Sequence, residues 1–119
     1  MTASCFEELE IWKRSREIVK NIYLDFSEIK DFEFRNQIYS AGYSIMNNIG
    51  EGFGRESKKE FIRFLDFSKG SSWEVKNMYY IAEVVGYIDS EIAKKRREAC
   101  EFEKNSIAKL MGYLKPTNK

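Results

Sequence analysis

The chain has 119 residues, enough for one domain with a single hydrophobic core but too few for two domains of common size. Its 20 Lys and Arg residues against 19 Asp and Glu residues, with no His, give a net charge of +1. This balance excludes a protein that coats nucleic acid through its overall charge alone. We therefore expect a single domain over residues 1–119, and any nucleic-acid surface has to be local.

The chain carries only two cysteines, Cys5 and Cys100, and they form no Cys-x-x-Cys pair. Because 43% of the residues are hydrophobic and can build an ample core, both are expected to be reduced thiols. The first residues lack the basic start and apolar run of a secretory signal. No segment approaches the roughly 18 consecutive apolar residues of a membrane span. These features favour a cytoplasmic location.

The spacing of apolar residues predicts four helices. The first covers about residues 7–26; Ser4 and Glu7 have the spacing of a capping box at its start, and a start one turn away is the alternative. The second covers about residues 33–53 and is expected to end at the glycine cluster of residues 50–54. The only proline, Pro116, follows the last periodic segment, so the interior can be nearly all helix.

The third helix is expected to begin at Ser57, which forms a second capping box with Glu60, and to end near residue 85 or 87. Asp89 is expected to cap the fourth helix, whose inner face extends to Leu114. Four amphipathic helices with short connections pack as an antiparallel bundle. The sequence therefore predicts an all-α, up-down-up-down four-helix bundle.

The second helix carries more than one apolar stripe. A first stripe, expected to face the core, consists of Phe34, Ile38, Ala41, Ile45, Ile49 and Gly52. A second stripe follows a different side of the helix and includes Tyr39, Tyr43, Met46 and Phe53. The third helix repeats this pattern with Ile62, Trp73 and Tyr80 outside its core face. Because large apolar patches are rare on monomers, these seven residues predict a subunit interface; alternatively, they cover their own bundle.

The same region resembles a known family. The residues that carry the resemblance are Gln37, the run 44–52, Arg55, Ser57, Phe61, Phe64, Leu65, Gly70, Ser71 and Glu74, with the runs 6–12 and 86–88. Together they are similar to the four-helix-bundle proteins encoded in 23S rRNA intervening sequences. This resemblance implies a homopentamer. A related branch, the accessory variability proteins of diversity-generating retroelements, binds nucleic acid and a reverse transcriptase.

Two groups of basic residues are candidates for phosphate contacts. Arg55, Lys58, Lys59 and Arg63 surround the start of the third helix, where the helix dipole also favours anions. Lys94 and Arg97 can face outward together on the fourth helix and form a secondary patch. The alternative for both groups is an ordinary solvated surface.

No sequence pattern indicates catalysis. The glycine-rich run 50–54 follows a helix and is not a GxxxxGK[ST] loop, so a helix end is the better interpretation. Paired-metal sites in bundles usually need Glu-x-x-His, which a chain without His cannot supply. The two cysteines have no His to activate them. We therefore expect no enzyme activity, no metal and no cofactor.

Arg96 and Glu103 project onto the apolar side of the fourth helix. Either their long side chains reach past its edge into water, or they pair with the polar residues of the second helix or with a neighbouring subunit. Taken together, the sequence favours a non-enzymatic oligomeric scaffold associated with RNA or another nucleic acid. The alternative is a protein-interaction adaptor that does not bind nucleic acid.

Overall fold

The structure, a computed structural model, describes residues 3–116; residues 1–2 and 117–119 of the expected domain lie outside the described part. It consists of a short 3-10 helix, η1 (Phe6–Glu8), and four long helices: α1 (Glu10–Phe26), α2 (Phe32–Phe53), α3 (Lys58–Val84) and α4 (Ser90–Leu114). No strand occurs between residues 3 and 116. The predicted all-α class with four helices is confirmed.

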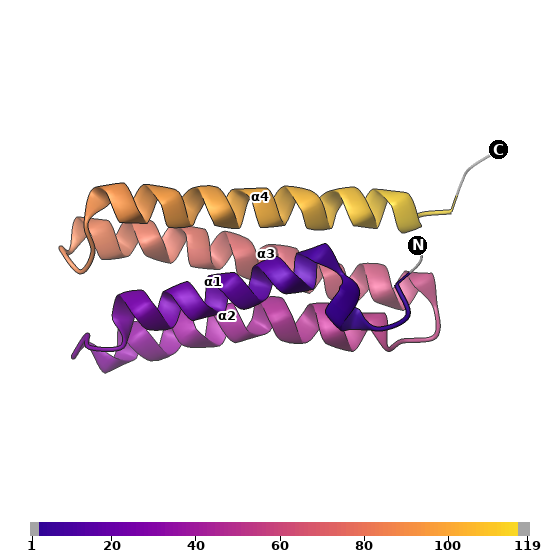
Figure 1. Cartoon of the computed structure of the whole chain (residues 1–119), viewed down its shortest axis with the longest axis horizontal. Coiled ribbons are helices and arrows are strands. Elements are labelled where there is room, and N and C mark those ends of the chain that lie inside the picture. The colour runs from indigo at the N-terminus through magenta and orange to yellow at the C-terminus, as the bar shows by residue number, and fades with distance from the viewer. Residues whose placement is uncertain (1–2, 117–119) are drawn as a thin grey trace.

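The helices lie side by side, and the chain reverses direction at each connection (Figure 1). Each helix packs on two others, since α1 contacts α2 and α4, and α3 also contacts α2 and α4. The bundle measures 51 × 23 × 20 Å along its principal axes. This order around the bundle places the groove between α1 and α2 opposite the groove between α3 and α4.

Side-chain caps set the starts of three helices. At α2 the Asp31 carboxylate accepts a hydrogen bond from the Phe34 amide at 3.1 Å. The Ser57 hydroxyl accepts a hydrogen bond from the Glu60 amide at 3.1 Å, and Asp89 accepts from the amides of Glu91 and Ile92. The predicted caps of α3 and α4 are therefore confirmed. The first helix begins at Glu10, within one turn of the predicted start, because the 3-10 turn of η1 precedes it. The predicted capping box is wrong, since Ser4 donates to Glu8 instead of bonding to Glu7.

The glycines of α2 have a different role from the expected one. The helix continues through Gly50 and Gly52 and ends at Phe53, so only Gly54 marks its end. A methyl group on Gly52 would lie 2.7 Å from the Phe64 Cβ atom on α3. Gly52 is thus required for the close approach of the two helices.

The core follows the predicted first stripe of α2, all of whose members are buried. Serines let α3 approach α2 closely: the Ser68 hydroxyl donates to the Ile45 carbonyl at 2.8 Å, and Ser71 bonds to Ser44 at 2.7 Å. The neighbouring Gly70 is exposed and does not take part in this contact. Among the described residues, no helix has the length and apolar character needed to cross a membrane.

Candidate nucleic-acid and oligomer interfaces

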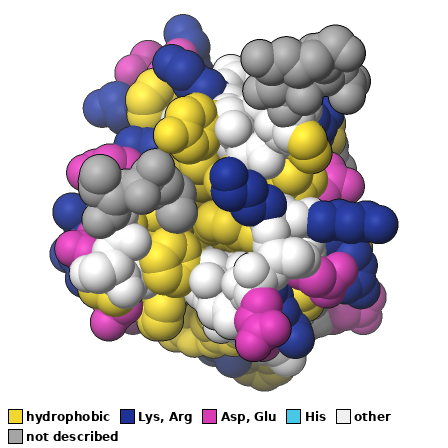
Figure 2. All heavy atoms as spheres, turned by 90° about the vertical axis from the view of Figure 1, so that its right-hand side faces the viewer, with side chains coloured by type: hydrophobic (Ala, Val, Ile, Leu, Met, Phe, Trp, Pro, Cys, Tyr) yellow, Lys and Arg dark blue, Asp and Glu magenta, His cyan; other side chains and the backbone are white. Residues whose placement is uncertain are grey.

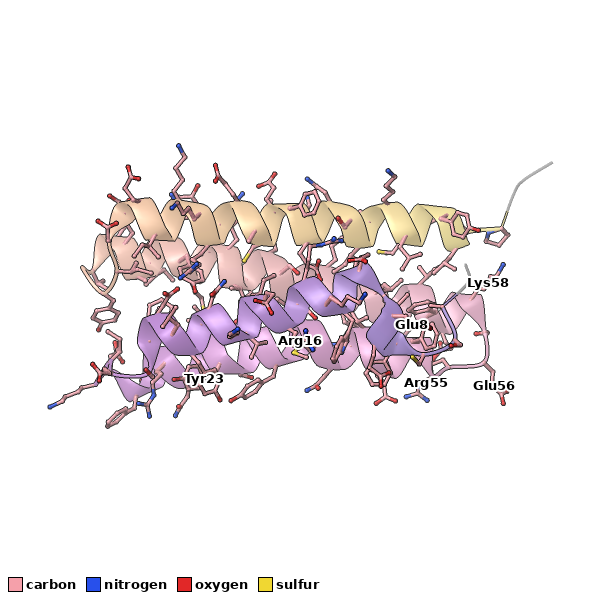
Figure 3. The ribbon with its side chains drawn as sticks, in the orientation of Figure 1. Glu8, Arg16, Tyr23, Arg55, Glu56 and Lys58 are labelled. Carbon is pink, nitrogen blue, oxygen red and sulfur yellow. The ribbon has the colours of Figure 1, made fainter. Side chains whose placement is uncertain are left out.

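The four predicted phosphate-binding residues lie together at one end of the bundle. Arg55 belongs to the connection between α2 and α3, and Lys58, Lys59 and Arg63 belong to the first turns of α3. Arg55 and Lys58 point away from the helices at this end, as does the acidic Glu56 (Figure 3). Figure 2 faces the same end and shows Lys and Arg side chains gathered with apolar side chains and several carboxylates. We call this surface the basic end face.

The charges on the basic end face differ in their pairing. Arg55 forms an ion pair with Glu51 at 3.3 Å, and Arg63 forms one with Glu60 at 3.2 Å. Within residues 3–116, no ion pair involves Lys58, Lys59 or Lys115, all of which are exposed. These three lysines line one groove of about 980 Å³ between the start of α3 and the end of α4. They are therefore available to an anionic partner.

The sequence pattern did not assign Lys115 to the basic end face, because Lys115 is 56 positions from Lys59 along the chain. It follows α4, whose last turn lies at the end of the bundle where α3 begins (Figure 1). An antiparallel topology brings the end of one helix beside the start of its neighbour. That topology was the only signal in the sequence that could have placed Lys115 here.

Two arginines and two phenylalanines form a continuous surface beside the basic end face. The Arg55 guanidinium lies 4.8 Å from the centre of the Phe64 ring. The Arg63 guanidinium lies 5.4 Å from the centre of the Phe64 ring and 5.3 Å from that of Phe67. The two rings meet edge to face at 5.9 Å. We call these four residues the Arg–Phe cluster. The sequence pattern indicated Arg55 and Arg63 as candidate contacts but not Phe64 or Phe67.

The secondary basic patch is weaker than the sequence suggested. Lys94 and Arg97 line the same groove of about 510 Å³ between α3 and α4. Arg97, however, bonds to Glu83 at 2.6 Å and lies 4.0 Å above the Tyr80 ring, and only 14% of its side chain is exposed. The Arg97 guanidinium thus faces Glu83 and Tyr80 of α3 and is little exposed to a partner. Lys94 is exposed, but it lies in the first turns of α4, at the opposite end of the bundle from the basic end face.

Part of the predicted oligomer interface lies on the α1/α2 side. Tyr39 and Tyr23 stack with parallel rings at 4.2 Å, and the hydroxyls of Tyr23 and Tyr43 are hydrogen-bonded. Tyr43 remains 41% exposed, and it lines a groove of about 530 Å³ with Met46 and Trp12. Tyr23 is 40% exposed. We call this surface the tyrosine face.

The other predicted interface residues are elsewhere. Phe53 and Ile62 are half-buried against the core near the turn from α2 to α3. Trp73 and Tyr80 are each 48% exposed on the side of α3 that meets α4. The ammonium groups of Lys76 and Lys104 lie 4.4 and 4.5 Å from the centre of the Trp73 ring. This tryptophan face is opposite the tyrosine face, so the seven residues do not form one patch.

The two charged residues on the inner side of α4 are both paired with α1. Arg96 donates two hydrogen bonds to Asp25, at 2.7 and 2.9 Å. Glu103 is fully buried and accepts one hydrogen bond from Arg14 at 3.2 Å, while its second carboxylate oxygen has no partner among the described residues. The expectation that these side chains reach water is wrong. The expectation of pairing is right, but the partners are on the first helix instead of the second.

The cysteine thiols are unreactive in character. Burial raises the pKa of Cys100 to about 12, and the nearby Glu103 raises it further. The pKa of Cys5 is also raised, by desolvation and by the neighbouring Glu8 and Glu7. A thiol whose pKa is raised holds little thiolate at neutral pH and is a poor nucleophile. Across residues 3–116, no three His, Cys, Asp or Glu side chains are grouped so as to hold a metal ion.

Comparisons with known proteins agree with this architecture. The family model described as 23S rRNA-intervening sequence protein matches residues 7–109. A crystal structure of a protein with unknown function from the S23 ribosomal protein family of Bacteroides thetaiotaomicron VPI-5482 has the same fold, with a TM-score of 0.79. It is 22% identical, and the match covers 85% of this chain and 97% of that chain. The comparison with curated proteins found no match. Because the family model spans most of the chain, the protein belongs to the 23S rRNA-intervening sequence protein family.

Proposed function

We propose that the protein is a non-enzymatic, homo-oligomeric scaffold that binds the phosphate backbone of RNA or another nucleic acid through its basic end face. The observation that carries this proposal is the convergence of Lys58, Lys59 and Lys115, none of them in an ion pair within the described residues, around one groove. The family description names an intervening sequence of 23S rRNA, which makes RNA the first nucleic acid to test as a partner.

The basic end face has two features that favour a phosphate group. The positive end of the α3 dipole lies at the same place as the lysines, and both favour a negative group. Phosphates carry no sequence information, so the contacts give affinity without strong sequence preference. A few lysines bind weakly by themselves. Repeating the face on every subunit of an oligomer would raise the combined affinity.

The proposed oligomer is cyclic and head-to-tail. The tyrosine face and the tryptophan face expose large aromatic side chains on opposite sides of one bundle. A ring forms when one face of a subunit binds a different face of the next and the rotation closes. Five subunits is the number implied by the family resemblance. The two faces are consistent with any closed ring.

The test is a salt-dependent titration. Labelled RNA is titrated with wild type and with the Lys58→Gln/Lys59→Gln variant at several salt concentrations. The logarithm of affinity should fall with log salt by about 0.7 to 0.9 per neutralised phosphate, and the double variant should lower the slope by about two such contacts. Lys20→Gln/Lys30→Gln removes the same charge from exposed lysines of α1 and the α1–α2 connection and should leave the slope unchanged. Equal slopes for all three proteins would refute the assigned site.

The second candidate function is a protein-interaction adaptor. It is favoured by the exposed aromatic residues, above all Trp73 and Tyr80, which anchor many protein interfaces. The two functions differ in one simple measurement: a nucleic-acid scaffold purified without nuclease should carry an elevated absorbance ratio at 260 over 280 nm. Absence of binding to any RNA or DNA at about 50 mM salt would leave the adaptor function.

A further inference from the structure

We propose that the Arg–Phe cluster is a stacking site for single-stranded nucleic acid, in which an unpaired base lies on the exposed side of the Phe67 ring. This inference rests on the proposed function, because the basic end face would bring the strand to the cluster. It goes further by naming the form of nucleic acid and the residue that contacts a base. Its central observation is an exposed aromatic ring bordered by arginines.

The positions of the residues along α3 form a path from the end of the bundle onto its side. Lys59, Arg63 and Phe67 are each four residues apart, which places them in one row on a helix with about 5 to 6 Å between neighbouring Cβ atoms. A strand whose phosphates contact Lys59 and Arg63 therefore arrives beside Phe67. Phe67 is 47% exposed, although phenylalanine has no polar group that favours contact with water.

The cluster is ordered before any partner arrives. The half-buried Phe64 ring packs edge to face with the Phe67 ring, and the Arg63 guanidinium lies near the Phe67 ring. Planar guanidinium groups stack on bases as well as on aromatic rings. The carboxylates of Glu51 and Glu60 hold the two arginines by exposed ion pairs, which are weak. A phosphate can replace either carboxylate at small cost.

The geometry favours a single strand over a duplex. In a duplex the bases are stacked on each other and paired, so a side chain on the convex surface of a helix reaches only phosphates and groove edges. Unpaired bases have free faces, and stacking on an aromatic side chain contributes to binding whatever the base. A polyanion with free bases is the partner that fits.

The experiment compares three probes of equal length: a single-stranded RNA, the duplex of the same sequence, and a strand of abasic sugar phosphates. Phe67→Ala should weaken binding of the single strand by about 5- to 150-fold, which corresponds to the loss of one stacked base. Phe67→Tyr should bind like wild type, because it retains an aromatic ring. Phe67→Ala should leave the affinity for the duplex and the abasic strand unchanged.

Phe32→Ala is the matched control. Phe32 is also an exposed phenylalanine with an arginine over its ring, Arg35 at 4.6 Å, but it begins α2, at the opposite end of the bundle from the basic end face. Its removal should leave all three affinities unchanged. A strand that carries 2-aminopurine gives a direct signal, because stacking on Phe67 should quench its fluorescence with wild type and not with Phe67→Ala.

The outcomes separate this inference from the proposed function. Equal binding of single strand and duplex, with no effect of Phe67→Ala, would overturn the stacking site while leaving the basic end face as a phosphate site. No binding of any probe at low salt would overturn both. Loss of oligomer mass in Phe67→Ala, measured by light scattering, would assign the cluster to a contact between subunits and refute the stacking site. Selective loss of single-strand binding by a fully assembled variant would support it.

Discussion

Arg96 of α4 clamps Asp25 of α1 with two parallel hydrogen bonds, at 2.7 and 2.9 Å, and the carboxylate is almost completely buried. The Tyr79 hydroxyl of α3 donates a third hydrogen bond to the same carboxylate at 2.7 Å. Three helices thus meet at one buried charge. Further along the same seam the charges are reversed, since Arg14 of α1 pairs with Glu103 of α4. Sliding α1 along α4 would bring like charges together. These two pairs therefore specify the register of α1 against α4, the contact that closes the bundle.

The first prediction concerns the stability of this seam. Asp25→Ala should lower the free energy of unfolding by about 3 to 5 kcal/mol, because it leaves Arg96 without a counter-charge and the Tyr79 hydroxyl without an acceptor. Urea unfolding at one fixed protein concentration measures this change, since an oligomer's stability depends on concentration.

Two variants test the reason for that loss. Asp66→Ala removes the partner of Lys69 in an exposed pair and should cost at most about 0.5 kcal/mol. Combining Asp25→Leu with Tyr79→Phe and Arg96→Met replaces the buried charges by apolar groups and should recover most of the lost stability. If the triple variant is as unstable as Asp25→Ala, packing and not charge explains the effect.

The second prediction is a pH dependence caused by Glu103. Burial raises the pKa of this carboxyl from 4.5 to about 7, and the ion pair with Arg14 offsets only part of the effect. The folded protein therefore binds this proton more tightly than the unfolded chain, so the contribution of Glu103 to stability is fully present below about pH 4.5 and is lost as the pH rises through about 7. The contribution is about 3 kcal/mol. Glu103→Gln should remove this loss and be more stable than wild type at pH 8.

Glu101→Gln provides the control for the sign of this effect. Its hydrogen bond and ion pair with Lys76 lower the pKa of Glu101, so its contribution to stability is present at neutral pH and lost in acid. Chemical unfolding at pH 5 and pH 8 distinguishes the two residues. A wild-type protein that is equally stable at both pH values, with Glu103→Gln unchanged, would contradict the assigned pKa of Glu103.

The third prediction contrasts two glycines. Gly52→Ala should destabilise the fold by about 1 to 3 kcal/mol, because the new methyl group would lie 2.7 Å from the Phe64 Cβ atom and 3.0 Å from the Phe61 ring. Gly70→Ala should stabilise it by about 0.5 to 1 kcal/mol, since Gly70 lies inside α3 and a methyl group there meets no atom within 4 Å. Thermal unfolding of both variants measures the difference. A loss of stability in Gly70→Ala would place an unrecognised contact at that surface.

The features that the sequence predicted are those that depend on residues close together in the chain. The caps at Ser57 and Asp89 need only the next few amides, and the core stripe of α2 follows from helical periodicity. The partners of Arg96 and Glu103 could not be predicted, because they depend on which helix closes the bundle beside α4. For the same reason the basic residues of the first turns of α3 were found together, whereas Lys115 and the pairing of Arg97 with Glu83 required the folded arrangement.

The last prediction tests the head-to-tail ring. Tyr43→Glu should give monomers, because it places a charge in a contact that excludes water, and Trp73→Ala should do the same by removing the anchor of the opposite face. Each variant keeps the face that the other has lost, so mixing the two should produce a heterodimer joined by one intact contact. Light scattering measures all three masses. If the two variants stay monomeric after mixing, the tyrosine face does not bind the tryptophan face and the proposed ring is wrong.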